Sequence, residues 1–173
     1  MSDNETNEQA TMDSFMERYR ALARKCKREQ RMLMNHVCLR VEDIDQAEEF
    51  LEQSFGLSGF IRPGGELFEG EKELSVLWIN DEFYLELMQP EDAQKIGYDT
   101  GSRGSQPIGH LSEVGFFVPD MDRATDHLGS LGWRVTTAIE DHGARMCKMD
   151  TEQPSGFPVE LIDVDLDKSG SPV

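Results

Sequence analysis

The chain has 173 residues, 38% of them hydrophobic, which is enough for one well-packed domain or two small tandem modules. Its formal net charge of −17 argues against nucleic acid as a partner, because an acidic surface repels phosphate. No apolar run approaches the roughly 20 residues of a membrane span, and the three cysteines show no ligand-type spacing, so the sequence predicts a cytoplasmic protein with reduced thiols.

The N-terminal segment is predicted to be a short tail followed by a helix. Residues 1–11 are polar and acidic, unlike a signal peptide, and are predicted to be disordered. Over 12–31, apolar residues recur at helical spacing on one face, namely Met12, Phe15, Met16, Tyr19, Leu22, Ala23 and Cys26. Ser14 and Glu17 have the spacing of a capping box. We expect the apolar face to dock on the body of the protein or on a second subunit.

An internal repeat organises the rest of the chain. The segment VEDIDQAEEFL (41–51) matches VPDMDRATDHL (118–128), and FYLELM (83–88) matches FPVELI (157–162). The chain is therefore predicted to contain two copies of one unit. The predicted boundaries are 32–90 for the first unit, 91–107 for a linker, 108–165 for the second unit and 166–173 for a tail.

Each unit has the pattern strand–helix–strand–strand–strand. The predicted strands lie near 33–41, 59–62, 73–79 and 82–88 in the first unit, and near 112–118, 133–138, 144–149 and 157–163 in the second. Asp43 is predicted to cap the first helix, and Gly56 lies near its end. The second helix is predicted near 121–131, with Gly132 as its C-terminal cap.

Strand alternation gives the direction of the polar side chains, because successive residues point to opposite faces. His36, together with Cys38 and Arg40, is expected on the face away from the helix of its unit. The same alternation places Glu86 and Glu160 on that face, in the middle of the last strand of each unit. Strand interiors disfavour glutamate, and a buried carboxylate needs a partner. Two equivalent glutamates are therefore difficult to explain as surface residues.

The doubled unit, the segments NHVCLRVEDIDQA and EVGFFVPDMDRA, and the terminal strands YLELMQP and GFPVELID resemble the vicinal oxygen chelate superfamily over about residues 33–164. This superfamily includes glyoxalases, methylmalonyl-CoA epimerases, extradiol dioxygenases and bleomycin resistance proteins. The resemblance implies an α+β fold in which two tandem βαβββ units form a cupped mixed sheet, here with an extra N-terminal helix. It also implies a divalent metal inside the cup and a homodimer.

The resemblance implies metal ligands on the first and last strands of each unit. Three positions match, and they are His36, Glu86 and Glu160. The fourth position has two candidates. The alignment of the two units places Glu113 there, whereas His110 could serve instead if a β-bulge re-aims the strand. A site with Glu113 suits Mn or Fe, and a site with His110 suits Ni, Co or Zn.

The predicted function is that of a metal-dependent isomerase, epimerase or glyoxalase-type lyase. It would remove a proton next to a metal-chelated carbonyl of a small oxygenated substrate, with Glu160 or Glu86 as the base. One alternative is an extradiol-type dioxygenase, which needs two histidines and a glutamate around Fe(II). Another is a non-catalytic, resistance-type binding protein, whose cup would be lined by Tyr84, Met88, Phe117 and Met149.

Overall fold

The structure is a computed structural model that describes residues 3–63, 71–90, 110–141, 143–152 and 157–166. The predicted linker at 91–107 and all but the first residue of the predicted tail at 166–173 lie outside the described residues. No helix in the described part of the chain combines the length and the hydropathy that crossing a bilayer requires.

The described elements alternate along the chain as the repeat predicts. Their bounds are α1 (Asp3–Glu29), β1 (Leu33–Arg40), α2 (Ile44–Phe55), β2 (Glu71–Asn80), β3 (Phe83–Pro90), β4 (His110–Phe117), α3 (Met121–Ser130), β5 (Trp133–Asp141), β6 (Ala144–Thr151) and β7 (Val159–Val164). The short strand expected near 59–62 is reduced to one bridge between Ile61 and Val76. The predicted fold class, α+β with two tandem βαβββ units and an extra N-terminal helix, is confirmed.

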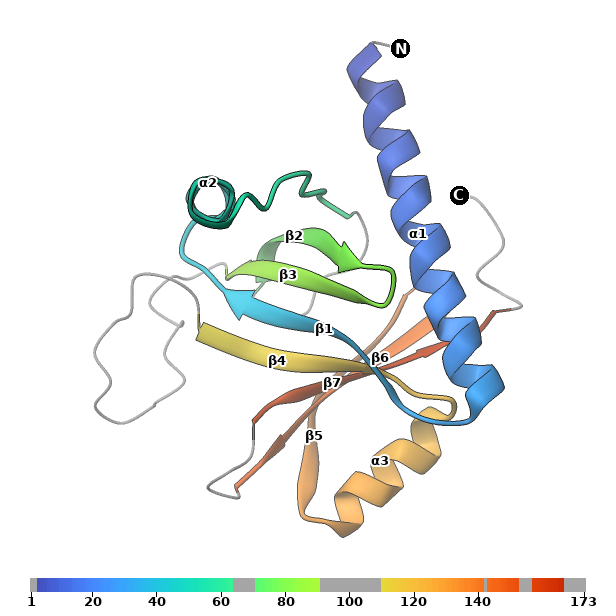
Figure 1. The fold of residues 1–173 in the computed structure, drawn as a ribbon. Coiled ribbons are helices and arrows are strands. Elements are labelled where there is room, and N and C mark those ends of the chain that lie inside the picture. Colours follow the sequence, from blue (N-terminus) through green and yellow to red (C-terminus); the bar gives the residue numbers. More distant parts are fainter. Residues whose placement is uncertain (1–2, 64–70, 91–109, 142, 153–156, 167–173) are drawn as a thin grey trace.

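The strands form one mixed sheet in the order β2-β3-β1-β4-β7-β6-β5 (Figure 1). Within each unit the first and last strands are parallel neighbours, β1 with β3 and β4 with β7. The two units meet at the centre of the sheet, where β1 and β4 pair antiparallel. Each face of the sheet therefore carries side chains from both units.

The repeated V-x-D-x-D-x-A motif marks the start of a helix in each unit. The Asp43 carboxylate accepts a hydrogen bond from the backbone N–H of Gln46 at 2.9 Å, and Asp120 accepts one from Arg123 at 2.9 Å. Such N-caps contribute typically about 1 kcal/mol each. Gly132 follows α3 with a φ of 90°, a left-handed conformation that favours glycine. The N-cap predicted at Asp43 is confirmed, whereas the C-cap residue of α3 is Leu131 and Gly132 comes directly after it.

Helices α2 and α3 cover one face of the sheet through two apolar clusters. The first contains Val41, Ile44, Ala47 and Leu87, and the second contains Val118, Met121, Ala124, Cys147, Met149, Val159 and Leu161. Met149 was expected in the cup, and this expectation is wrong. The alternation of β6 places Met149 with Cys147 toward α3, whereas Met146 faces α1.

Helix α1 packs on the opposite face of the sheet, which we call the inner face. It begins at Asp3 rather than at residue 12, so Ser14 lies inside the helix and the predicted capping box with Glu17 is wrong. Its buried residues join two apolar clusters. One contains Leu22, Ala23, Cys26, Leu33, Phe117, Ile162 and Val164, and the other contains Phe15, Val76 and Tyr84. The apolar stripe of α1 therefore docks on the body of the same chain.

Polar contacts fasten the C-terminal end of α1 to the second unit. Lys27 forms an ion pair with Asp163, and its ammonium donates a hydrogen bond to the carbonyl of Pro119 at 2.9 Å. The same Asp163 carboxylate accepts a hydrogen bond from the N–H of Met121, at the start of α3, at 2.9 Å. Asp163 therefore links α1, α3 and β7.

Candidate functional site

The strand register aligns a row of residues across the inner face. His36 pairs with Tyr84 on one side and with Gly115 on the other, Gly115 pairs with Glu160, and Glu160 pairs with Lys148. Cross-strand partners share a face of the sheet, because the pleats of neighbouring strands are in phase. The row therefore brings an imidazole of the first unit next to a carboxylate and an ammonium of the second.

His36 lies at the centre of this row and is 0% exposed. Its ring stacks on Tyr84, with centroids 4.9 Å apart and an interplanar angle of 22°. On its other side the ring lies against the backbone of Gly115, where an added Cβ would be 1.9 Å from Cε1. Only glycine at position 115 therefore leaves room for this imidazole.

The buried imidazole of His36 is neutral at neutral pH. Burial lowers its pKa to about 4, while the charge of Glu113 acts in the opposite direction. Neither ring nitrogen has a hydrogen-bond partner among the residues that the structure describes. The nearest carboxylate oxygen is Oε2 of Glu160, 3.5 Å from Nε2. A neutral imidazole with a free lone pair is a suitable metal ligand.

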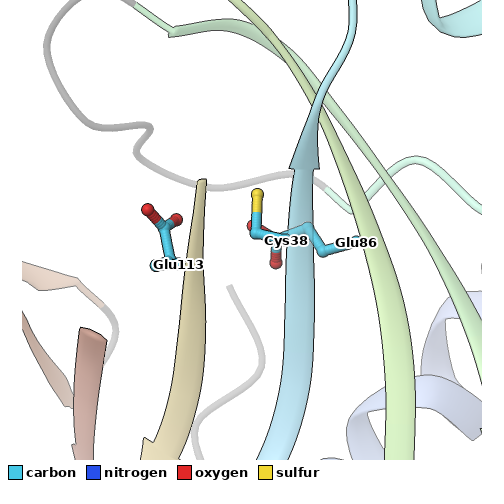
Figure 2. Close-up of side chains that lie close together, drawn as sticks. All are labelled: Cys38, Glu86 and Glu113. Atoms are coloured by element: carbon cyan, nitrogen blue, oxygen red, sulfur yellow. The ribbon is translucent and has the colours of Figure 1, made fainter. Parts of the chain in front are cut away.

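A second row on the inner face contains Glu86, Cys38 and Glu113 on β3, β1 and β4 (Figure 2). One ligand atom from each side chain, the sulfur of Cys38 and a carboxylate oxygen of each glutamate, lies within 4.8 Å of the other two. Cys38 and Glu113 are buried, at 0% and 4% exposed. Burial raises the pKa of the Cys38 thiol, and the charges of Glu86 and Glu113 raise it further.

Lys148 places a positive charge beside this second row. Its ammonium lies 3.2 Å from Oε1 of Glu113, and the hydroxyl of Ser112 donates a hydrogen bond to Oε2 at 2.7 Å. The two charged side chains are only 15% and 5% exposed. Lys148 is the cross-strand partner of Glu160, and in the first unit the partner of the corresponding glutamate, Glu86, is Val76. The lysine therefore belongs to the second unit alone.

The structure brings the predicted ligands to one face but arranges them in two groups. Glu160 lies next to His36, whereas Glu86 and Glu113 lie next to Cys38. The β-bulge considered for His110 exists, since the register shifts between Glu113 and Leu111. The backbone of His110 pairs with Arg40, and its side chain lies outside the described residues.

This collection of donors fits a divalent cation. Carboxylates, a neutral imidazole and a thiol are all established ligands for such ions. Three glutamates and one ammonium carry two net negative charges, which one divalent ion would balance. The His36 nitrogens, buried without a hydrogen-bond partner among the described residues, add an independent indication, because an unpaired buried polar group is costly.

Aromatic residues of α1 cover one side of the site. Tyr19 packs on Phe117 with ring centroids 4.7 Å apart, and Phe15 packs on Tyr84 at 5.6 Å. Burial, with the charges of Glu160 and Glu86, raises the pKa of Tyr19 above its usual value. Tyr84 and Phe117 thus pack against α1 rather than line an open cup.

A separate cavity of about 380 Å³ lies between α1 and the first unit. It is lined by Ser14, Phe15, Arg18, Gly59, Ile61, Val76, Leu77 and Trp78. None of the candidate ligands lines it.

Comparison with known proteins agrees with this architecture. Residues 33–161, more than half of the chain, match the model of the Glyoxalase/Bleomycin resistance protein/Dioxygenase superfamily. No curated protein sequence gives a significant match.

Among solved structures, 135 chains match significantly. A methylmalonyl-CoA epimerase in complex with methylmalonyl-CoA and NH4+ is 20% identical, with a TM-score of 0.57 over 76% of this chain and 93% of the other. A variant of the Streptomyces coelicolor methylmalonyl-CoA epimerase in complex with 2-nitronate-propionyl-CoA is 21% identical, with a TM-score of 0.58 over 81% and 98%. The epimerase from Mycobacterium tuberculosis is 22% identical, with a TM-score of 0.54 over 75% and 85%. At these identities the likeness establishes the fold, and together with the matched family model it shows that the chain belongs to the glyoxalase/bleomycin resistance protein/dioxygenase superfamily.

Proposed function

We propose that this protein is a metal-dependent enzyme that transfers a proton next to the carbonyl of a small oxygenated substrate, as an isomerase, an epimerase or a glyoxalase-type lyase. One observation carries the proposal. Glutamates of both units, Glu86, Glu113 and Glu160, lie on the same face of the sheet as a buried, neutral His36 that has no hydrogen-bond partner among the described residues. The epimerase fold of the solved structures supports it and makes acyl-CoA esters the first substrates to test.

The candidate ligands of the divalent ion are His36, Glu86, Glu113 and Glu160, with His110 as the alternative to Glu113. Mn, Fe, Co, Ni and Zn are all compatible with carboxylate and imidazole donors. When bound, the ion supplies electrostatic stabilisation of the negative charge that develops on the substrate oxygens. These side chains come from four adjacent strands, β3, β1, β4 and β7.

In this proposal Glu160 acts as the base. It takes the proton from the carbon next to the carbonyl. The C–H bond breaks, its electron pair moves toward the carbonyl oxygen, and a new O–H bond forms on the carboxylate. Glu160 lies 3.5 Å from Nε2 of His36 and pairs across the strands with Lys148, so these two side chains form the surroundings of the base. Glu86 belongs to the other unit and could return a proton from the opposite side, as epimerisation requires.

The test is incorporation of solvent deuterium into candidate substrates. Protein loaded separately with each metal is incubated in D₂O with methylmalonyl-CoA, with 2-oxo acids and with keto sugars, and exchange is followed by NMR. We expect exchange next to the carbonyl of at least one substrate, and none with EDTA-treated protein. Glu160→Gln should slow exchange by about 10²–10⁴-fold, the usual contribution of a general base.

Glu152→Gln provides the matched control, since the side chain of Glu152 is 82% exposed and pairs with Arg134. This variant should exchange deuterium at the wild-type rate. If no metal supports exchange with any of these substrate classes, the proposed function is wrong.

A further inference from the structure

We propose that Cys38 is a metal ligand, so that the metal centre is a mixed thiolate–carboxylate site formed by Cys38, Glu86 and Glu113. The proposal rests on the proposed function only in requiring a divalent ion on the inner face. It adds the identity of the atoms that hold the ion. The resemblance to the superfamily implied histidine and glutamate ligands and no cysteine.

The strand register makes these three residues direct neighbours. Cys38 pairs with Glu86 on β3 and with Glu113 on β4, so the three residues form one row across three strands, and their side chains lie close together (Figure 2). Donor atoms on one ion, each at about 2.0–2.3 Å, lie at most about 4.5 Å apart. The three donor atoms here lie within 4.8 Å of one another, so a small side-chain rotation brings them into range. Among the described residues, no other histidine, cysteine and acidic side chains meet in such a group.

A second, independent observation points to a ligand at this place. His36 lies two residues before Cys38 on the same strand, is 0% exposed, and has two ring nitrogens without a hydrogen-bond partner among the described residues. The charge of Glu113 acts on the His36 ring, so the imidazole is within electrostatic reach of the row. An unpaired imidazole buried next to the row is costly, and this is a second indication that a ligand binds on this part of the inner face.

The surroundings of Cys38 differ from those of the other two cysteines. Cys26 and Cys147 lie in apolar clusters, where they act as small hydrophobic side chains. Cys38 belongs to none of the apolar clusters of the described residues, and its thiol is hydrogen-bonded to Glu86. A set of one thiolate and two carboxylates favours borderline ions such as Zn²⁺ and Co²⁺ over Mg²⁺ or Ca²⁺.

This assignment also separates the two candidate bases. Glu86 holds the ion, and Glu160, which lies beside His36 and outside the Cys38 group, takes the substrate proton. With Glu86 as a ligand rather than as a second acid, the assignment narrows the proposed function to an isomerase or lyase in which the single base Glu160 removes and returns the proton.

Two measurements on the full chain test the proposal. Titration of Co²⁺ into EDTA-treated protein should produce a near-ultraviolet thiolate-to-cobalt charge-transfer band. X-ray absorption of zinc-loaded wild-type protein should show one sulfur neighbour at about 2.3 Å. The second measurement needs no variant, so it remains informative even if substitution of Cys38 prevents folding.

Variants give the matched comparison. Cys38→Ser should lose the band and bind Co²⁺ at least about tenfold more weakly by calorimetry, the lower end of the effect of groups that merely support a ligand. Cys147→Ala should keep the band. Stoichiometric metal binding without a sulfur neighbour or a band would overturn the role of Cys38 and leave the proposed function standing. No binding of any divalent ion would overturn both.

Discussion

The ammonium of Lys148 and a bound metal ion would compete for the same carboxylate, that of Glu113. The Lys148 ammonium lies 3.2 Å from Glu113, so it supplies the positive charge that a bound ion would otherwise provide. Without metal, Lys148→Met should destabilise the protein by up to about 3–5 kcal/mol, because it leaves a buried carboxylate without its cation. With metal, the same variant should bind the ion more tightly, since no ammonium opposes it.

Urea unfolding in EDTA and calorimetric metal titration measure the two effects of Lys148→Met. Arg134→Met is the control, because it removes an exposed ion pair with Glu152 and should cost less than about 1 kcal/mol. Equal stability and equal metal affinity in Lys148→Met and the wild type would show that Lys148 does not compete with the ion.

His36 should give the protein a specific pH dependence. The pKa of His36 is lowered from 6.5 to about 4, so between these values the unfolded chain takes up a proton that the folded protein does not. The stability that this residue contributes is therefore complete above about pH 6.5 and is lost as the pH falls toward 4. The free energy of unfolding that is lost in this way is of the order of 3 kcal/mol.

Urea unfolding of the metal-free protein at about pH 7 and about pH 5 measures this dependence. The free energy of unfolding should fall less from the higher to the lower pH in His36→Gln than in the wild type. His127→Gln, which changes an exposed histidine on α3, should behave as the wild type. If the free energy of unfolding of His36→Gln changed with pH as much as that of the wild type, the prediction would be wrong.

The sequence placed several candidate ligands on the correct face and missed two important residues. His36, Glu86 and Glu160 were found because alternation within a strand and the internal repeat both point to them. Lys148 was missed because its counterpart in the first unit is Val76, so the repeat carries no trace of it. Cys38 was placed on the inner face, but only the pairing of β1 with β3 and β4 shows its two acidic neighbours.

At the scale of elements, local signals predicted most of the fold. The repeated aspartates give the helix starts, and alternation gives the strands, because both depend on neighbours in sequence. The start of α1 and the position of Met149 were wrong for different reasons. Residues 3–11 carry no apolar stripe to indicate a helix, and the assignment of Met149 depends on which face of β6 meets α3.

The docking of α1 should contribute substantially to stability. Leu22 is 4% exposed and packs with Phe117 and Ile162 on the inner face. Leu22→Ala should cost about 2–5 kcal/mol, since it removes buried apolar area and leaves a cavity. Arg24→Ala, on the exposed side of the same helix, should stay within about 0.5 kcal/mol of the wild type. Urea unfolding compares them, and equal stabilities would mean that α1 is not docked in solution.

At the scale of the whole molecule, the candidate centre lies where the two units join. Cys38 and Glu86 come from the first unit and Glu113 comes from the second, across the antiparallel pairing of β1 and β4. A bound ion would therefore connect the two halves in addition to the backbone hydrogen bonds of this pair. Loss of the ion should weaken both halves together.

Metal should accordingly stabilise the two units as one. With free Zn²⁺ or Co²⁺ at about a hundredfold above its Kd, the free energy of unfolding should rise by about 2.7 kcal/mol.

The chain has two tryptophans, Trp78 on β2 and Trp133 on β5, so Trp78→Phe and Trp133→Phe proteins report each unit separately by fluorescence. Both reporters should shift to the same higher urea midpoint with metal and return with EDTA. Glu113→Gln should lose most of the shift, whereas Glu152→Gln should keep it. A metal-induced shift confined to one tryptophan would show that the ion binds within a single unit.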